Sequence, residues 1–217
     1  MGERAEGPAR AAVVTSLGAV TAFGAGVEAF WRGALAGRSG IAPVTRFSTD
    51  PYRSCVAAEI PAGSLVRETD ELETGATSAT RLAFASAREA LADSPFPDAM
   101  ERFGLVVGTS MGENGPFIDW VRSGTTPGIR PATATLFSVA SALARHFHAR
   151  GPTLTVSVAC ASGTLAVGIG ADLIRRGECD AVLAGGFDVL SEFVFAGFDS
   201  LRALSPSASR PFDRRRD

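Results

Sequence analysis

Short apolar runs alternate with amphipathic segments along most of the chain. Runs rich in Val, Ile, Leu and Ala are typical of buried strands, and they predict strands at 11–21, 54–60, 102–110, 153–159 and 180–189. Apolar residues at helical spacing predict helices at 26–40, 76–94, 137–150 and 161–177. This alternation of strand and helix predicts an α/β fold whose sheet is parallel or mostly parallel and is covered on both faces.

The segments between these elements are polar or rich in turn residues. Residues 41–75 are mixed and contain Pro, Ser, Thr and acids, and Gly108–Gly115 reads as a glycine-bearing loop. Residues 1–10 are predicted to be a loose N-terminus, and everything from 11 to 217 is assigned to one folding unit. The last stretch, 203–217, is polar and ends in arginines.

Composition is that of a soluble globular protein, with 46% hydrophobic and 20% charged residues among 217. The net charge of −2 gives no electrostatic reason to expect nucleic acid or an anionic membrane as partner. The N-terminus carries acidic residues before any apolar run, unlike a signal peptide, and later apolar runs are interrupted before they reach membrane-spanning length. A cytoplasmic protein is predicted.

The inventory of reactive side chains is small. There is no lysine, since all 21 basic residues are arginine, so Schiff-base chemistry within this chain is excluded. The three cysteines are far apart and form no C-x-x-C pair, which speaks against a disulfide framework or a zinc site and fits a reducing compartment.

Cys160 lies where the predicted strand 153–159 meets the predicted helix 161–177. At a helix start several N–H groups lack partners and the helix dipole is positive, so a thiolate is favoured there and a nearby oxyanion can be bound. The alternative is a buried cysteine that serves as a small hydrophobic residue. Cys55 and Cys179 lack the junction setting, and for them this alternative is the prediction.

Several motifs resemble the β-ketoacyl-acyl carrier protein synthases, the condensing enzymes of fatty-acid and polyketide synthesis. The residues that carry the resemblance are VSVACASGTLAVGIGADLIRRGECDAVLAGGFD (156–188), VVTSLGAVTAFGAGVEAFWRGALAGRSGI (13–41), RLAFASAREAL (81–91), LVVGTSMG (105–112), AGFDSLRALSP (196–206) and SRPFDRRRD (209–217). The resemblance is collinear from 11 to 217. It implies the N-terminal half of a thiolase-like fold, in which two similar α/β halves place the nucleophile at a buried helix start.

The resemblance also implies roles for individual residues. Cys160 would receive the acyl group from an acyl carrier protein, and its own N–H would be one oxyanion donor. Met111 falls where the family lines the end of the acyl pocket, with simple core filling as the alternative. Phe198 falls where an aromatic gate beside the nucleophile is expected. No metal or organic cofactor is implied.

The base for this chemistry is absent from the sequence. In the family, two histidines (one in an H-G-T-G-T motif) and a lysine bind and polarise the malonyl thioester, and none of these motifs occurs here. His146 and His148 are two positions apart, so they face different sides of a helix, and they are predicted to have packing or surface roles.

The resemblance therefore covers about half of a condensing enzyme. The first reading is a split ketosynthase, in which a complementary C-terminal-half chain supplies the histidines and the lysine; family analogy then predicts a dimer of heterodimers. A truncated piece of a single-chain ketosynthase is the second reading. The third is a non-catalytic scaffold or chain-length subunit, which the retained Cys160 argues against. Any lone half is expected to expose a large apolar face.

Overall fold

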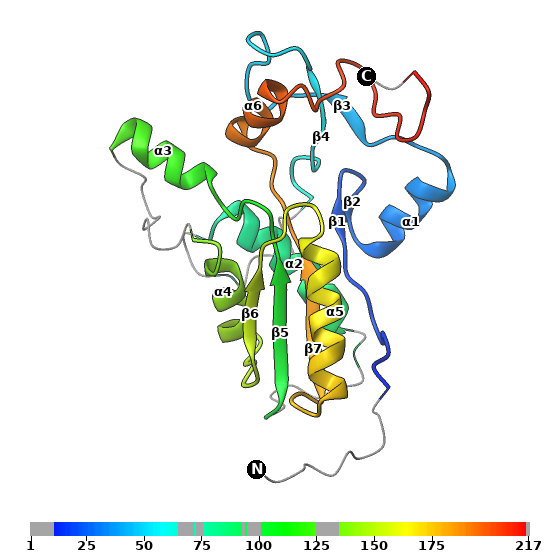
Figure 1. Cartoon of the computed structure of the whole chain (residues 1–217), viewed down its shortest axis with the longest axis vertical. Coiled ribbons are helices and arrows are strands. Elements are labelled where there is room, and N and C mark those ends of the chain that lie inside the picture. Colours follow the sequence, from blue (N-terminus) through cyan, green and yellow to red (C-terminus); the bar gives the residue numbers. More distant parts are fainter. Residues whose placement is uncertain are drawn as a thin grey trace.

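A parallel three-stranded sheet forms the centre of the computed structural model, which describes residues 11–64, 72, 76–92, 94, 101–124 and 135–215. Its strands are β5 (Phe103–Gly108), β6 (Thr153–Val156) and β7 (Ala181–Gly186). They are ordered β6-β5-β7, with both pairs parallel (Figure 1). The sequence prediction of a parallel sheet is confirmed.

Helices cover both faces of this sheet, as predicted. Helix α5 (Ser162–Arg175) packs on one face against β5 and β7. Helices α2 (Ser78–Ala92) and α4 (Ser138–His146) pack against each other on the opposite face (Figure 1). Because successive strand residues face opposite sides, β5 contributes to a separate apolar cluster on each face.

A second group of elements lies beyond the carboxyl ends of the central strands (Figure 1). It contains two short antiparallel hairpins, β1 (Val20–Thr21) with β2 (Gly24–Ala25) and β3 (Ile41–Pro43) with β4 (Val56–Ala58). It also contains the helices α1 (Val27–Leu35), α3 (Gly115–Ser123) and α6 (Glu192–Ser200). Of the active-site candidates, Phe198 lies on α6, and Cys160 and Met111 lie in the connections that follow β6 and β5.

The predicted helices 26–40, 76–94, 137–150 and 161–177 are confirmed as α1, α2, α4 and α5, each with shorter bounds. Gly37 follows α1 with φ +61°, a left-handed conformation that favours glycine and ends the helix. Sequence reasoning missed β2, β3, α3 and α6, which are short and lack a long periodic pattern. The predicted loose segment 1–10 lies outside the described residues.

The prediction of a strand at 11–21 is wrong for most of its length. Only Val20 and Thr21 pair with another strand, and 11–19 carry no strand assignment. Val13 and Val14 are each 74% exposed, which is unusual for residues of such high strand propensity. A strand needs a hydrogen-bonded neighbour, and no neighbour for 11–18 is found among the described residues.

Large apolar side chains are exposed on several helices. On helix α5, Leu165 and Val167 are 40% and 48% exposed. Trp31 on α1 and Phe193 on α6 are also exposed.

None of the helices in the described part of the chain combines the length and apolar character that crossing a bilayer requires.

Candidate active site

Cys160 lies in the tight connection between β6 and α5, at the carboxyl edge of the sheet, as the sequence predicted. Its side chain is exposed, and this corrects the family-based expectation of a buried helix start. Within the described residues, no segment covers it. The N–H groups of Gly163 and Thr164 in the first turn of α5 have no intramolecular acceptor among the described residues.

The conformation of this connection is fixed by Ser162, which is 2% exposed. Its hydroxyl accepts a hydrogen bond from the N–H of Val158 at 2.8 Å and donates one to the carbonyl of Ala159 at 2.6 Å. Ala159 has φ +47°, a left-handed conformation that is strained for a residue with a side chain. Ser162 therefore stabilises the strained turn that presents Cys160.

Replacing Ser162 by Ala is expected to lower the unfolding free energy by about 1–3 kcal/mol, because the N–H of Val158 loses its acceptor. Denaturant titration of both proteins would measure the change. Ser200→Ala is the matched control: its hydroxyl also bonds a carbonyl three residues earlier, but it is exposed, so a change within about 0.5 kcal/mol is expected. Equal effects of the two substitutions would contradict the role given to Ser162.

Two glycines, Gly108 and Gly186, allow the start of α5 to pack closely against the ends of two strands. A Cβ at Gly108 would lie 2.3 Å from both the carbonyl carbon and the carbonyl oxygen of Ser162. A Cβ at Gly186 would lie 2.8 Å from the Cα of Gly163. These contacts hold the turn containing Cys160 directly above β5 and β7.

The loops that follow the three central strands are bonded to one another. Asp188, after β7, accepts hydrogen bonds from the hydroxyl of Thr109 at 3.2 Å and from the N–H of Ser110 at 3.0 Å. Ser157, after β6, donates to the carbonyl of Ser110 at 3.3 Å. The loop that carries Met111 is thus joined both to the turn that carries Cys160 and to the segment that leads into α6.

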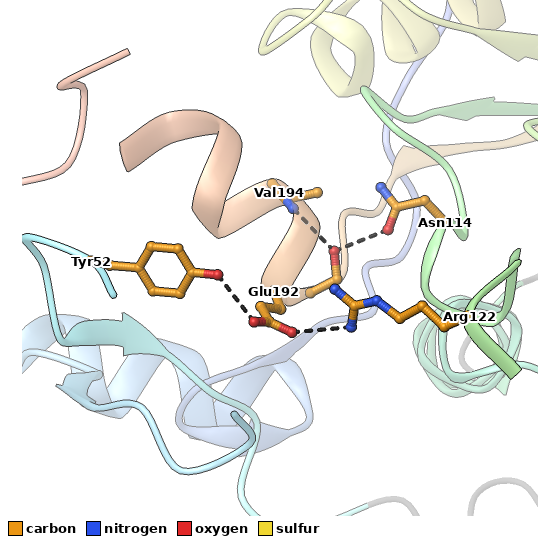
Figure 2. Close-up of polar contacts among 6 residues, drawn as sticks. Tyr52, Asn114, Arg122, Glu192 and Val194 are labelled. Carbon is orange, nitrogen blue, oxygen red and sulfur yellow. Dashed lines mark hydrogen bonds and ion pairs between the residues drawn. The ribbon is translucent and has the colours of Figure 1, made fainter. Parts of the chain in front are cut away.

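The N-terminus of α6, the helix that carries Phe198, is anchored by polar contacts (Figure 2). The hydroxyl of Ser191 caps the helix by accepting from the N–H of Val194 and donates to the side-chain oxygen of Asn114 at 2.9 Å. Glu192 accepts from the Tyr52 hydroxyl at 3.0 Å and pairs with Arg122 at 3.4 Å. These bonds fix α6 relative to the loop that carries Met111.

Met111 and Phe198 therefore come from loops and helices around the same edge as Cys160. Their side chains are 44% and 43% exposed, so Met111 is not core filling within this chain. Their pocket and gate roles stay predictions. The cavity of about 790 Å³ in this structure lies beside β7 and is lined by none of Cys160, Met111 and Phe198.

The two remaining cysteines differ in burial, and one histidine packs against an aromatic ring. Cys179 is fully buried in the cluster under α5, as predicted, and burial raises the pKa of its thiol. Cys55 is exposed just before β4, so the prediction that it fills the core is wrong. The ring of His146 packs edge-on against Phe84 at 4.6 Å, which confirms a packing role.

Glu113 is a buried carboxylate in the loop after β5. It is 4% exposed, and it accepts a hydrogen bond from the N–H of Ala79 at the start of α2. Burial raises the pKa of Glu113 above its ordinary value, although the bonds from Ala79 and Thr77 partly oppose this. Glu113 thereby fastens the loop that carries Met111 to α2.

The raised pKa of Glu113 predicts a pH-dependent stability. Between its ordinary pKa and the raised folded value, the folded state binds more protons than the unfolded state, so the unfolding free energy falls as pH rises through this window. Glu113→Gln is expected to flatten that fall. Denaturant midpoints measured from mildly acidic to neutral pH would test it, and identical slopes for both proteins would contradict it.

Sequence reasoning missed the residues that shape the site. Asp188 and Glu113 could not be selected by a pattern search, because they bond to groups that are distant in sequence. Ser162 alone had a local signal, since Ser near a helix start commonly bonds to the neighbouring backbone.

The sequence matches the profile of the β-ketoacyl synthase N-terminal domain over residues 9–217. This chain belongs to the β-ketoacyl synthase family. The match covers all the described residues, so the sheet edge, the turn of Cys160 and α6 are parts of this domain. The resemblance inferred from the motifs is confirmed.

Curated relatives and solved structures agree with this assignment. The chain is 35% identical over 235 residues to the tetracenomycin polyketide synthase ketoacyl synthase alpha subunit of Streptomyces glaucescens, covering 94% of this chain and 54% of that one. It is 30% identical to the 3-oxoacyl-[acyl-carrier-protein] synthase 2 of Coxiella burnetii, covering 96% and 54%. The ishigamide ketosynthase/chain length factor structure superposes with a TM-score of 0.84 at 30% identity, over 96% of this chain and 55% of that one.

The chain spans about half the length of the curated relatives it matches. The thiolase-like fold expected from the sequence is confirmed for this half.

Proposed function

We propose that this chain carries the nucleophile of a β-ketoacyl-acyl carrier protein synthase and that Cys160 accepts the acyl group. The observation that carries the proposal is the strained turn at the start of α5, which Ser162 holds and which presents an exposed thiol beside N–H groups without acceptors. A thiol in that position gains nucleophilicity as the thiolate, and unpaired N–H groups can bind an oxyanion.

In the first step the thiolate of Cys160 attacks the carbonyl carbon of an acyl carrier protein thioester. A new carbon–sulfur bond forms, and the carrier's thiol leaves after taking up a proton. The N–H of Cys160 is the proposed donor to the oxyanion formed in between. Met111 is proposed to line the end of the acyl pocket, and Phe198 to act as a gate beside the thiol.

In the second step a malonyl carrier thioester loses carbon dioxide, and the resulting carbanion attacks the acyl group on Cys160. The carbon–sulfur bond breaks and the thiolate is regenerated. This step needs groups that bind and polarise the malonyl thioester, for which the family uses two histidines and a lysine. This chain has no lysine, and His146 packs against Phe84 away from the site, so a complementary C-terminal half is proposed to supply these groups.

A non-catalytic chain-length role is the second candidate, favoured by the likeness to a ketosynthase/chain length factor structure. The retained thiol argues against it, because a scaffold has no need of a nucleophile held in a strained turn. The proposal is the same whether the complementary half is a second chain, as in a dimer of heterodimers, or a continuation of this one.

The test begins with the protein purified from its own source together with whatever half accompanies it. Its intact and native masses identify that half, and incubation with acetyl-acyl carrier protein and longer acyl thioesters follows. An acyl adduct confined to Cys160 would support the proposal. Absence of any adduct on the complete assembly would overturn it in favour of the scaffold role.

A further inference from the structure

The loop between β3 and β4 holds helix α6 along one side. Phe195, in the middle of α6, is 3% exposed, and its ring packs edge-on against the rings of Phe47 and Tyr52, each at a centroid distance of 5.4 Å. Asp199, near the end of α6, accepts a hydrogen bond from the N–H of Arg53 at 3.0 Å. The β3–β4 loop therefore contacts α6 both at its middle and near its end.

This loop has a defined conformation of its own, so it can act as a support. The N–H of Val44 donates to the carbonyl of Cys55 at 2.9 Å, which closes the loop at its base. Within the loop, the N–H of Tyr52 donates to the carbonyl of Thr49 at 2.9 Å and closes a turn. These two bonds fix the backbone that carries Tyr52.

Glu192, the first residue of α6, joins this loop to a second support, helix α3. One carboxylate oxygen accepts a hydrogen bond from the Tyr52 hydroxyl at 3.0 Å, and the other accepts one from Arg122 of α3 at 3.4 Å. The two side chains reach Glu192 from opposite sides (Figure 2). Tyr52 and Arg122 lie 140 and 70 residues from Glu192 in the sequence, so three distant parts of the chain meet at one carboxylate.

The bond from Tyr52 is the stronger of these two contacts. A hydroxyl that donates to a carboxylate forms a charge-assisted bond, roughly twice as strong as a neutral one. Burial raises the pKa of Tyr52, and the bond to Glu192 raises it further, so the hydroxyl remains a donor at neutral and mildly alkaline pH. The Arg122 side chain is 66% exposed, and exposed ion pairs contribute little on their own. Loss of the Glu192 carboxylate therefore mainly releases Tyr52.

The same end of α6 is joined to the loop that carries Met111. The hydroxyl of Ser191 donates to the side-chain oxygen of Asn114, three residues after Met111. Phe198 lies six residues beyond Glu192, which is about 9 Å along the helix axis. A tilt of α6 about its first residue would therefore move Phe198 relative to Met111.

We propose that Glu192 is a positioning residue that selects acyl groups by fixing Phe198 relative to Met111. The inference rests on the proposed function, in which Phe198 stands beside the thiol and Met111 lines the end of the acyl pocket. A long acyl chain must fit past Phe198 and against Met111 at the same time, whereas an acetyl group is too short to extend from the thiol to the pocket end. Transfer of long chains therefore depends more strongly on the position of α6 than transfer of acetyl does.

The test measures acyl transfer to Cys160 by intact mass, with the chain assembled with its complementary half. The two donors are acetyl-acyl carrier protein and the longest straight-chain acyl carrier protein thioester that the unaltered enzyme accepts. Glu192→Ala is expected to lower the ratio of the long-chain rate to the acetyl rate at least about fivefold. Loss of folded protein would lower both rates together and leave the ratio unchanged. An unchanged ratio in a folded Glu192→Ala protein would overturn the inference.

Glu28→Ala is the matched control. Glu28 also lies in the first turn of a helix and pairs with an arginine, but its partner Arg32 belongs to the same helix, α1. Its replacement removes the same charge near a helix start without disconnecting two parts of the chain, so the ratio is expected to stay within about twofold. A fall as large as that of Glu192→Ala would show that any loss of first-turn charge has this effect, which would contradict a positioning role.

Tyr52→Phe tests whether Glu192 acts through the tyrosine. This substitution removes only the hydroxyl and keeps the ring that packs against Phe195. It is expected to lower the ratio at least about threefold by itself and to lower it no further when added to Glu192→Ala, because both changes break the same bond. Two effects that simply multiply would show that the residues act separately and would refute the proposed route.

The outcomes for this inference and for the proposed function can be told apart. An acyl adduct on Cys160 whose chain-length preference does not depend on Glu192 would refute the inference alone. Absence of any adduct on the complete assembly would refute the proposed function, and the selecting role of Glu192 would be refuted with it.

Discussion

Replacing Cys160 by Ala in the completed enzyme is expected to abolish acyl transfer, with a loss of at least about 10³-fold in rate. Cys160 is the exposed thiol at the start of α5, and Ser162 cannot take over the attack because its hydroxyl is buried and bonded both to Val158 and to Ala159. Intact-mass analysis after incubation with acyl carrier protein thioesters gives a direct reading, because the acyl adduct changes the mass of this chain.

Cys55→Ala is the matched control for this loss. Cys55 is also exposed, but it lies just before β4, in the hairpin beyond the sheet, where no helix start and no strained turn surround it. Its replacement is expected to leave the adduct unchanged. If the Cys160→Ala protein still acquired the adduct, or if Cys55→Ala lost it, the assignment of the nucleophile would be wrong.

Replacing Gly108 by Ala is expected to lower the unfolding free energy by about 3 kcal/mol or more. The new Cβ would lie 2.3 Å from backbone atoms of Ser162, which cannot rotate away as a side chain can. The start of α5 must therefore move off the sheet, and the turn of Cys160 moves with it. Denaturant titration measures the stability, and acyl-adduct formation is expected to fall in parallel.

Gly168→Ala makes the same chemical change in the interior of α5, where nothing lies within 4 Å of the new Cβ. Because Ala favours the helix over Gly, this substitution is expected to raise stability by about 0.5–1 kcal/mol. The two substitutions are expected to change the unfolding free energy in opposite directions, and this difference tests whether α5 lies as close to Gly108 as described. A Gly108→Ala protein as stable as the original would show that α5 does not press on β5 as described.

The sequence was sufficient to predict the helices and strands that have a long, regular pattern of apolar residues. Helices α2 and α5 and the strands β5 and β7 follow from periodicity because each buries one continuous face or lies fully inside the core. The junction position of Cys160 follows from the order of strand and helix, and its chemistry follows from the unpaired N–H groups at any helix start. The resemblance of its motifs to the family then predicted the N-terminal half of a thiolase-like fold. It also predicted that the two catalytic histidines and the lysine of the family are absent from this chain.

The failed strand at 11–21 marks the limit of such reasoning. A high strand propensity means that the side chains of a segment suit a pleated, half-buried surface. A strand forms, however, only when a neighbouring strand pairs with it. The described residues provide no such neighbour for 11–18. The exposed Cys160 and the half-exposed α5 have the same cause, since burial depends on what packs against a surface and not on the residues of that surface alone.

By itself, the sequence determined which residue is the nucleophile candidate, which elements surround it and which catalytic groups this chain lacks. Only the tertiary structure decided how the site is held: the Ser162 bonds to Val158 and Ala159, the approach of α5 to Gly108, and the link from Asp188 to Ser110. It also revealed the cavity beside β7. Contacts between residues far apart in the chain are set by packing geometry, which no local pattern of apolar and polar residues encodes.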